Sequence, residues 1–276
     1  MDYRSVKKIG GDLVLTGVKN FSLKDTLDCG QCFRWETDNG GCAGIAHGRR
    51  LEIKNENGDM VFKETAEAEF NSVWKKYFDL DRDYGRLHAM FAPDEILRTA
   101  AGFYPGLRLL RQEPWEALAS FIFSQNNNIP RIKKIIKIFC ESFGEPVGGG
   151  FAFPSAEKTA ALCESGLAPL RCGYRAEYLL CAARSVADGR IDLAAIESLQ
   201  TDEIRARLMS IKGIGPKVAD CVLLYGFGRT ERCPADVWIK RAKQKFYPGG
   251  FSNAFMAEPG IAQQYLFHYA RSNKIW

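Results

Sequence analysis

The sequence predicts an α+β fold, in which an N-terminal antiparallel β-sheet unit is followed by an all-helical unit. Two observations predict the order of these units. Short apolar runs separated by glycine-containing turns occupy residues 1 to about 65, whereas a helical period of apolar residues begins near residue 66. A third observation is a Gly-Ile-Gly turn at 213–215 between two helical patterns.

The N-terminal region carries the signature of paired strands. Leu13-Val14-Leu15 is a short apolar run, and residues 51–54 alternate between apolar and polar side chains. Asn57-Gly58 is typical of a two-residue hairpin turn, and the apolar run 60–62 follows it. We find no strong helical period before residue 66, so we expect strands alone in this region.

The remainder of the chain reads as helices separated by short turns. The clearest helical patterns cover residues 67–78, 114–124, 131–143, 156–164, 175–188, 201–211 and 217–225. The glycine-rich stretch 146–150 reads as a loop. We therefore expect a sheet domain with flanking helices at 1–110 and a helical domain at 111–276, with a helix–hairpin–helix at about 204–225.

Composition sets only broad limits on function. The 276 residues carry a formal net charge of +5, with a sequence pI near 8.7, which is compatible with a nucleic-acid partner without requiring one. No apolar stretch approaches the roughly 20 residues of a membrane span, and residues 1–4 do not begin a signal peptide. We expect a cytosolic protein without a membrane partner, whose nine cysteines are mostly reduced.

Cys29 and Cys32 form the one closely spaced cysteine pair. A zinc site would need two more ligands, and the chain has only three histidines, His47, His88 and His268. We therefore favour a structural role for the pair and expect no metal.

The stretch from Thr201 to Tyr225 predicts a helix–hairpin–helix. Thr201 is expected to cap the first helix, and residues 204, 208 and 211 share its apolar face. Gly213 and Gly215 allow a tight turn, after which Pro216 suits the first turn of the next helix. Free N–H groups at that helix start could bind a DNA phosphate. The alternative is a plain turn between helices.

Lys217 lies in the first turn of the second helix, on the same face as Cys221 and Tyr225. The positive end of a helix disfavours a lysine cation and so favours the neutral, nucleophilic amine. The alternative is a lysine that binds phosphate. Asp236 favours the nucleophile, because it stands where a helix should begin and could stabilise a developing sugar cation while also capping that helix.

Six blocks of the sequence together resemble the helix–hairpin–helix DNA glycosylase superfamily, and most closely the 8-oxoguanine DNA glycosylases of the eukaryotic type. The blocks occur in the family's order across nearly the whole chain. They are CGQCFRW (29–35), LLRQEPWEALASFIFSQNNNIPRI (109–132), GYRAEY (173–178), GIGPKVADC (213–221), PADV (234–237) and AQQYLF (262–267).

The resemblance implies a role for each matching position. Lys217 would be the Schiff-base nucleophile and Asp236 the catalytic carboxylate. Base recognition would fall to four residues. The carbonyl of Gly30 would accept the N7 proton specific to 8-oxoguanine. Cys221 and Phe267 would sandwich the flipped base, and Gln263 would read its pairing edge. The residues at the opposite cytosine would be Asn126, Arg131 and Arg175, with Tyr174 as the wedge.

The same resemblance implies an enzyme that removes 8-oxoguanine opposite cytosine and nicks the strand by β-elimination. Its partner would be double-stranded DNA, it would act as a monomer without a cofactor, and it would work at the nucleoid or in the nucleus. Two positions depart from the family pattern, because Trp238 stands where histidine is common and Tyr225 where methionine is common. Both departures concern the expected base pocket.

Two other functions are weighed against this one. Sibling enzymes act on alkylated bases or oxidised pyrimidines. However, the alkylbase enzymes typically lack the lysine, and endonuclease III-like members carry a C-terminal four-cysteine cluster, whereas no cysteine follows Cys233 here. A non-catalytic helix–hairpin–helix module would bind DNA in a salt-sensitive manner without releasing a base.

Overall fold

The computed structural model describes residues 1–38 and 41–275 and divides the chain into two units. The unit that we call the sheet unit comprises residues 1–44, 51–111 and 235–276, and the hairpin unit comprises residues 45–50 and 112–234. The α+β class is confirmed, since a six-stranded antiparallel sheet precedes a helical region.

The sheet has the strand order β1-β2-β6-β5-β4-β3. Its strands are β1 (Ser5–Ile9), β2 (Asp12–Thr16), β3 (Trp35–Asp38), β4 (Gly41–Ala46), β5 (Arg49–Glu56) and β6 (Asp59–Phe62). Asn57 and Gly58 both have positive φ and connect β5 to β6, as expected for the tight turn of a hairpin. The predicted apolar runs 13–15 and 60–62 pair with each other, Leu13 lying opposite Phe62.

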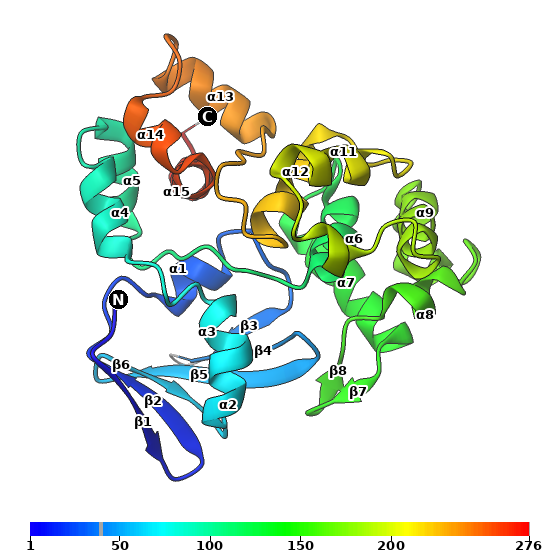
Figure 1. Cartoon of the computed structure of the whole chain (residues 1–276), viewed down its shortest axis with the longest axis horizontal. Helices are drawn as coiled ribbons and strands as arrows, with labels where there is room; N and C mark the ends of the chain where they lie inside the picture. Colours follow the sequence, from blue (N-terminus) through cyan, green and yellow to red (C-terminus); the bar gives the residue numbers. More distant parts are fainter. Residues whose placement is uncertain (39–40, 276) are drawn as a thin grey trace. The chain divides into compact units, whose positions relative to one another are not determined.

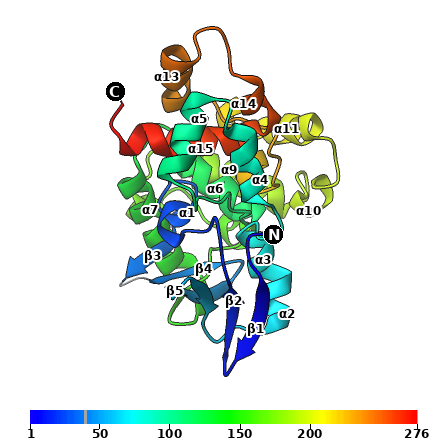
Figure 2. The same ribbon diagram turned by 90° about the vertical axis from the view of Figure 1, so that its left-hand side faces the viewer.

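Helices of the sheet unit complete its core. They are α1 (Leu23–Leu27), α2 (Glu67–Glu69) and α3 (Lys75–Tyr77) joined by a π-helical turn (Phe70–Trp74), α4 (Tyr84–Phe91), α5 (Glu95–Phe103), α13 (Val237–Phe246), α14 (Asn253–Ala257) and α15 (Pro259–Ser272). The segment from α2 to α3 covers one face of the sheet (Figure 1), where Phe70 packs edge-to-face on Phe62 at 5.2 Å between ring centroids. Helix α15 packs against α5 and α13 (Figure 2).

The hairpin unit is built around α6, whose side chains are almost all buried. Its elements are α6 (Pro114–Ser124), α7 (Ile129–Phe143), β7 (Pro146–Val147), β8 (Gly150–Phe151), α8 (Ala156–Ala160), a 3₁₀ turn (Ala168–Leu170), α9 (Arg175–Ala187), α10 (Leu193–Ile196), α11 (Thr201–Met209) and α12 (Pro216–Tyr225). Helices α7, α9 and α12 all pack on α6.

Four features differ from the sequence-based expectation. The short helix α1, capped by Ser22, interrupts the region expected to hold strands alone. Residues 146–151 form a small antiparallel hairpin instead of a loop. The predicted cap at Thr201 is wrong, because Gln200 is the N-cap of α11 and the Thr201 hydroxyl bonds to Glu231.

The fourth difference concerns the division of the chain. The expected break after residue 110 lies close to the border between units at 111 and 112, but the expected helical domain 111–276 is itself divided. Its last part returns to the sheet unit, because α15 packs on α5. Trp276 lies outside the described residues. None of the described helices is long and apolar enough to cross a membrane.

Candidate functional site

The hairpin between α11 and α12 brings Lys217 to the first turn of α12. Gly213 has a φ of +86°, and a Cβ atom at this position would overlap the Tyr178 ring, so the turn requires glycine. Gly215 is the N-cap of α12 and offers no capping side chain. An ion pair between Arg205 Nε and Asp220 Oδ1, 2.7 Å apart, holds α11 against α12. The predicted helix–hairpin–helix is therefore present.

The Lys217 side chain is half-buried and fixed by two contacts. Its Nζ donates a hydrogen bond to Ser124 Oγ at 3.2 Å and lies 5.3 Å from the centroid of the Phe121 ring. Phe121 in turn stacks on Tyr225, with ring centroids 5.1 Å apart and an interplanar angle of 14°. An aromatic face stabilises a nearby ammonium group. Lys217 and Tyr225, predicted to share a helix face, thus contact the same ring.

The corner between α6 and α7 connects the hairpin to the start of α9. Gln125 Nε2 donates to the carbonyl oxygen of Gly213 at 3.1 Å. The main-chain carbonyl of Gln125 accepts hydrogen bonds from Arg175 Nε at 2.8 Å and from the Tyr174 hydroxyl at 3.4 Å. Asn126, which has a φ of +47°, accepts from Arg175 Nη2 at 2.8 Å through its own carbonyl. These predicted site residues are therefore brought together.

Arg131 and Arg175, to which the family resemblance assigns the same task, have different environments. Arg175 is only 4% exposed, and its guanidinium donates to the carbonyls of Gln125, Asn126 and Cys172. Arg131 is exposed and donates to the carbonyl of Arg171 at 3.1 Å. In the structure described here, Arg175 holds the main chain of the α6–α7 corner, whereas Arg131 lies at the surface.

Asp236 begins α13 in the sheet unit. It is the N-cap residue, and its Oδ1 accepts a hydrogen bond from the main-chain N–H of Ile239 at 2.8 Å. The predicted cap is confirmed. Two positions later, Trp238 meets the Phe267 ring edge-to-face at 6.4 Å between centroids, and the Arg271 guanidinium lies 5.7 Å from the centroid of the same ring. Both contacts restrict the orientation of Phe267.

Gln263 lies in α15, one turn before Phe267. The side chain is 4% exposed, and its Oε1 has no hydrogen-bond partner among the described residues. A buried carbonyl oxygen without a partner costs about 1–3 kcal/mol. A ligand that donates a hydrogen bond here would remove that cost. His268 follows Phe267, and burial lowers its pKa to about 4, so this imidazole is neutral at pH 7.

Gly30 lies in a loop that is held on both sides. Its φ is +87°, a conformation that favours glycine. The preceding carbonyl, of Cys29, accepts from Gln264 Nε2 of α15 at 3.2 Å. The following residue, Gln31, is buried and donates from Nε2 to the carbonyls of Thr26 and Arg108, each at 2.8 Å. The main chain at Gly30 is therefore rigidly positioned beside α15.

Cys29 and Cys32 behave as buried structural thiols. Cys29 Sγ donates to the Thr26 carbonyl at 3.2 Å, and Cys32 Sγ to the Leu27 carbonyl at 3.5 Å. Burial raises the pKa of the Cys29 thiol to about 12, which keeps it protonated.

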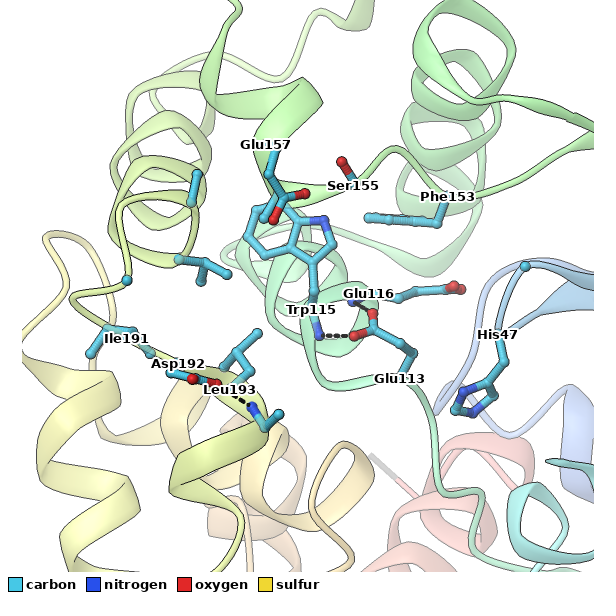
Figure 3. A pocket seen from close by; sticks show the side chains of 16 residues that line it. His47, Glu113, Trp115, Glu116, Phe153, Ser155, Glu157, Ile191, Asp192 and Leu193 are labelled. Carbon is cyan, nitrogen blue, oxygen red and sulfur yellow. Dashed lines mark hydrogen bonds between the residues drawn. The ribbon is translucent and has the colours of Figure 1, made fainter. Parts of the chain in front are cut away.

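The hairpin unit also contains a cavity of about 570 Å³ away from the predicted residues (Figure 3). Acidic and apolar side chains line it at the starts of α6, α8 and α10. Glu113 accepts from the N–H groups of Trp115 and Glu116, and Asp192 caps α10. Burial raises the pKa of Glu113. These polar side chains serve as helix caps, and no predicted site residue lines the cavity.

Sequence reasoning missed Ser124, Phe121 and Gln125, which hold Lys217 and the hairpin. All three lie in the block at 109–132. Ser124 and Gln125 stand directly before the Asn126-Asn127-Asn128 run, which is the signal that could have drawn attention to them.

Comparison with known proteins gives matches along most of the chain. Residues 13–118 match the N-terminal domain family of 8-oxoguanine DNA glycosylase, and residues 119–250 match the HhH-GPD superfamily of base excision DNA repair proteins. An N-glycosylase/DNA lyase of Saccharomyces cerevisiae is 33% identical over 257 residues, covering 82% of this chain and 68% of the relative. A probable N-glycosylase/DNA lyase of Methanothermobacter thermautotrophicus is 30% identical, covering 80% and 82%.

Two solved structures are similar over nearly the full length. The 8-oxoguanine glycosylase/lyase of Clostridium acetobutylicum, in complex with double-stranded DNA containing cytosine opposite 8-oxoguanine, has a TM-score of 0.93 at 37% identity and covers 99% of this chain and 100% of that one. MBOgg1 in complex with a low-affinity DNA ligand has a TM-score of 0.92 at 40% identity, with the same coverage.

Proposed function

Because this chain belongs to the helix–hairpin–helix superfamily of base excision DNA repair proteins, with the N-terminal domain of the 8-oxoguanine DNA glycosylases, we propose that it excises 8-oxoguanine opposite cytosine from duplex DNA and then cleaves the strand by β-elimination. The observation that carries this proposal is Lys217, half-buried in the first turn of α12 directly after the Gly213–Gly215 hairpin. The half-buried amine is held by Ser124 Oγ and lies over the Phe121 ring, which favours a fixed, reacting group over a mobile surface cation.

In the proposed reaction, the nitrogen of Lys217 attacks C1′ of the damaged nucleotide. The bond between C1′ and N9 breaks as the new bond forms, and the base leaves with the electron pair and takes the proton released by the amine. The remaining N–H proton then passes to O4′ as the sugar ring opens to an imine. Solvent water then takes a C2′ proton, the electrons of that C–H bond form a C2′=C3′ double bond, and the C3′–O bond breaks, so that the 3′ phosphate leaves with the electron pair.

Asp236 is assigned an electrostatic role in this scheme. Its carboxylate is held at the start of α13 by the N–H of Ile239. A fixed negative charge stabilises the positive charge that develops on the sugar as the glycosidic bond breaks. We assign it that role.

Recognition of the base is assigned to Gly30, Gln263, Cys221 and Phe267. The base must leave the DNA stack before it can be excised. The unpartnered Oε1 of Gln263 would accept from its pairing edge, and Phe267 would stack on its ring. The carbonyl of Gly30 would accept the N7 proton that guanine lacks. Losing that one bond costs about 1–3 kcal/mol, which corresponds to about fivefold to 150-fold discrimination.

The opposite strand is assigned to a second group of residues in the hairpin unit. Arg131, together with Asn126 and Arg175, would hold the unpaired cytosine, because a guanidinium presents several donors in one plane to its acceptors. Tyr174 is 49% exposed and would fill the gap left by the flipped base. Gly213 and Gly215 would let the backbone approach a phosphate.

Covalent trapping tests the proposal. With borohydride and a duplex containing 8-oxoguanine opposite cytosine, we expect an adduct with the unmodified protein and none with Lys217→Gln. Lys158→Gln is the matched control, because Lys158 is in the same unit but pairs with Glu145 on the surface. A full adduct with Lys217→Gln would contradict the proposal. Trapping on duplexes with alkylated bases or oxidised pyrimidines, but not on 8-oxoguanine, would indicate a sibling specificity.

A further inference from the structure

The hydroxyl of Ser124 links Lys217 to the main chain of α6. Ser124 is the last residue of α6 and is 93 positions from Lys217 in the sequence. Lys217 Nζ donates to Ser124 Oγ at 3.2 Å, and Ser124 Oγ donates to the carbonyl oxygen of Phe121 at 2.8 Å. The proposed catalytic and binding residues do not include this serine.

The direction of the two hydrogen bonds matters for the chemistry of the amine. A hydroxyl has one proton and two lone pairs. A carbonyl has no proton to give, so the bond to Phe121 must use the proton of the Ser124 hydroxyl. The oxygen can therefore face Lys217 only as an acceptor. A hydroxyl with a free proton would donate it to the lone pair of a neutral amine and occupy the electrons that must attack C1′.

The Phe121 ring is the second contact of Lys217, and it restricts the position of the amine from another side. The Phe121 ring has no lone pair to accept a strong hydrogen bond, and its stacking on Tyr225 fixes its plane. Ser124 and Phe121 together thus restrict the rotamers of the lysine. In the attacking, neutral form of the amine, this leaves the lone pair free to point away from both groups.

We propose that Ser124 is a positioning residue for the Lys217 amine, which selects its rotamer and keeps its lone pair available for bond formation. The inference rests on the proposed function, since it assumes that Lys217 is the nucleophile. Ser124 acts through Lys217 and has no direct role at the DNA.

Local helix geometry explains the hydrogen bond from Ser124 to the Phe121 carbonyl, but not the hydrogen bond from Lys217 to Ser124. A serine near a helix end commonly bonds to the carbonyl three or four residues earlier. Ser198 does the same without a lysine partner, donating to the carbonyl of Ala195 at 2.9 Å. Ser198 is exposed and follows α10, so Ser198→Ala is the matched control for loss of the local bond alone.

The test uses the full chain and a duplex with an abasic site, whose aldehyde forms an imine with an amine whichever base was removed. Borohydride supplies the hydride that reduces the imine to a stable adduct. We expect Ser124→Ala to slow single-turnover adduct formation about 10- to 100-fold, because small misplacements of a reacting group have effects of this size. Ser124→Thr keeps the hydroxyl and should restore most of the rate. The affinity of Ser124→Ala for a duplex with a reduced abasic site should stay unchanged. In Ser198→Ala, both the rate of adduct formation and this affinity should stay unchanged.

Three results would overturn the inference. The first is Ser124→Ala at the unmodified rate while Lys217→Gln forms no adduct. The second is an equal loss of rate in Ser124→Ala and Ser124→Thr, which would show that the hydroxyl is not what matters. The third is a parallel loss of rate and DNA affinity in Ser124→Ala. An adduct with Lys217→Gln would instead refute the proposed function itself, so the two failures are distinguishable. Thermal melting of each variant shows whether it is folded.

Discussion

Helices α12 and α13, one in each unit, begin in different ways. The N-cap of α12 is Gly215, which has no side chain to bond the free N–H groups of the first turn, whereas the N-cap of α13 is Asp236, whose carboxylate accepts from Ile239. The first four N–H groups of any helix lack partners within it. In α12, Pro216 has no N–H and no side chain caps the remaining groups, so these can bind an anion, while in α13 one of them orients a carboxylate. The same local feature therefore suits phosphate binding in one unit and side-chain orientation in the other.

Of the changes that test this comparison, Asp236→Asn is expected to have the largest effect, on the rate of excision. Asparagine caps a helix about as well as aspartate, so α13 should be retained while the negative charge is lost. We expect the single-turnover excision rate to fall about 100- to 1,000-fold, with DNA affinity and melting temperature little changed. Asp83→Asn is the control, since Asp83 caps α4 in the same unit through Arg86 N–H at 2.9 Å. An unaltered rate in Asp236→Asn would reduce Asp236 to a helix cap.

The two glycines of the hairpin should respond differently to alanine. Gly213→Ala forces a side chain into the positive φ region and onto the Tyr178 ring, so we expect it to lower the free energy of unfolding by about 2–4 kcal/mol. At Gly215, a Cβ would meet no atom within 4 Å. Gly215→Ala should therefore lower the free energy of unfolding by no more than about 1 kcal/mol, the usual cost of a poorer N-cap, but weaken DNA binding, because a phosphate is proposed to approach the bare backbone there.

Denaturant unfolding measures the stability of Gly213→Ala and Gly215→Ala, and DNA titration measures their affinity for a duplex. Equal stability of the two variants would show that the hairpin does not need the conformation of Gly213. Unaltered DNA affinity of Gly215→Ala would show that the start of α12 does not contact the DNA.

The two arginines provide the smallest expected effects. Arg175→Ala removes a guanidinium that bonds three carbonyls, so we expect a loss of about 2 kcal/mol in the free energy of unfolding. Arg131→Ala should leave stability unchanged and reduce the preference for cytosine over adenine opposite the lesion about tenfold. Excision from duplexes that differ only in the opposite base measures this. The same preference in both proteins would exclude Arg131 as the cytosine reader.

Features that depend on neighbouring residues could be predicted from the sequence. Asp236 as a helix cap, the Asn57–Gly58 turn and the bounds of α6 follow from side chains within a few positions of each other. The cap at Thr201 was predicted by the same reasoning and is wrong, because a distant partner, Glu231, bonds its hydroxyl. A side chain that could cap a helix locally can therefore form its hydrogen bond with a residue far along the chain instead.

Features that depend on distant residues could not be predicted in this way. The burial of Arg175 depends on main-chain carbonyls about 50 positions earlier, and nothing in its own segment signals them. The serine that holds Lys217 is 93 positions away and belongs to a helix that reads as ordinary core. Likewise, the return of residues 235–276 to the sheet unit depends on the packing of α15 against α5, which no local pattern encodes.

The division of the chain at residues 111 and 234 has a consequence for how such proteins diverge. Under the proposed roles, the uninterrupted segment 112–234 carries the amine, the hairpin and Cys221, whereas Gly30, Gln263 and Phe267 belong to the segments that flank it, together with Asp236. With these proposed roles, substitutions at Gly30, Gln263 or Phe267 would alter which base is accepted without touching Lys217 or the residues that hold it. The proposed arrangement would thus let the substrate range change while the attacking amine is retained.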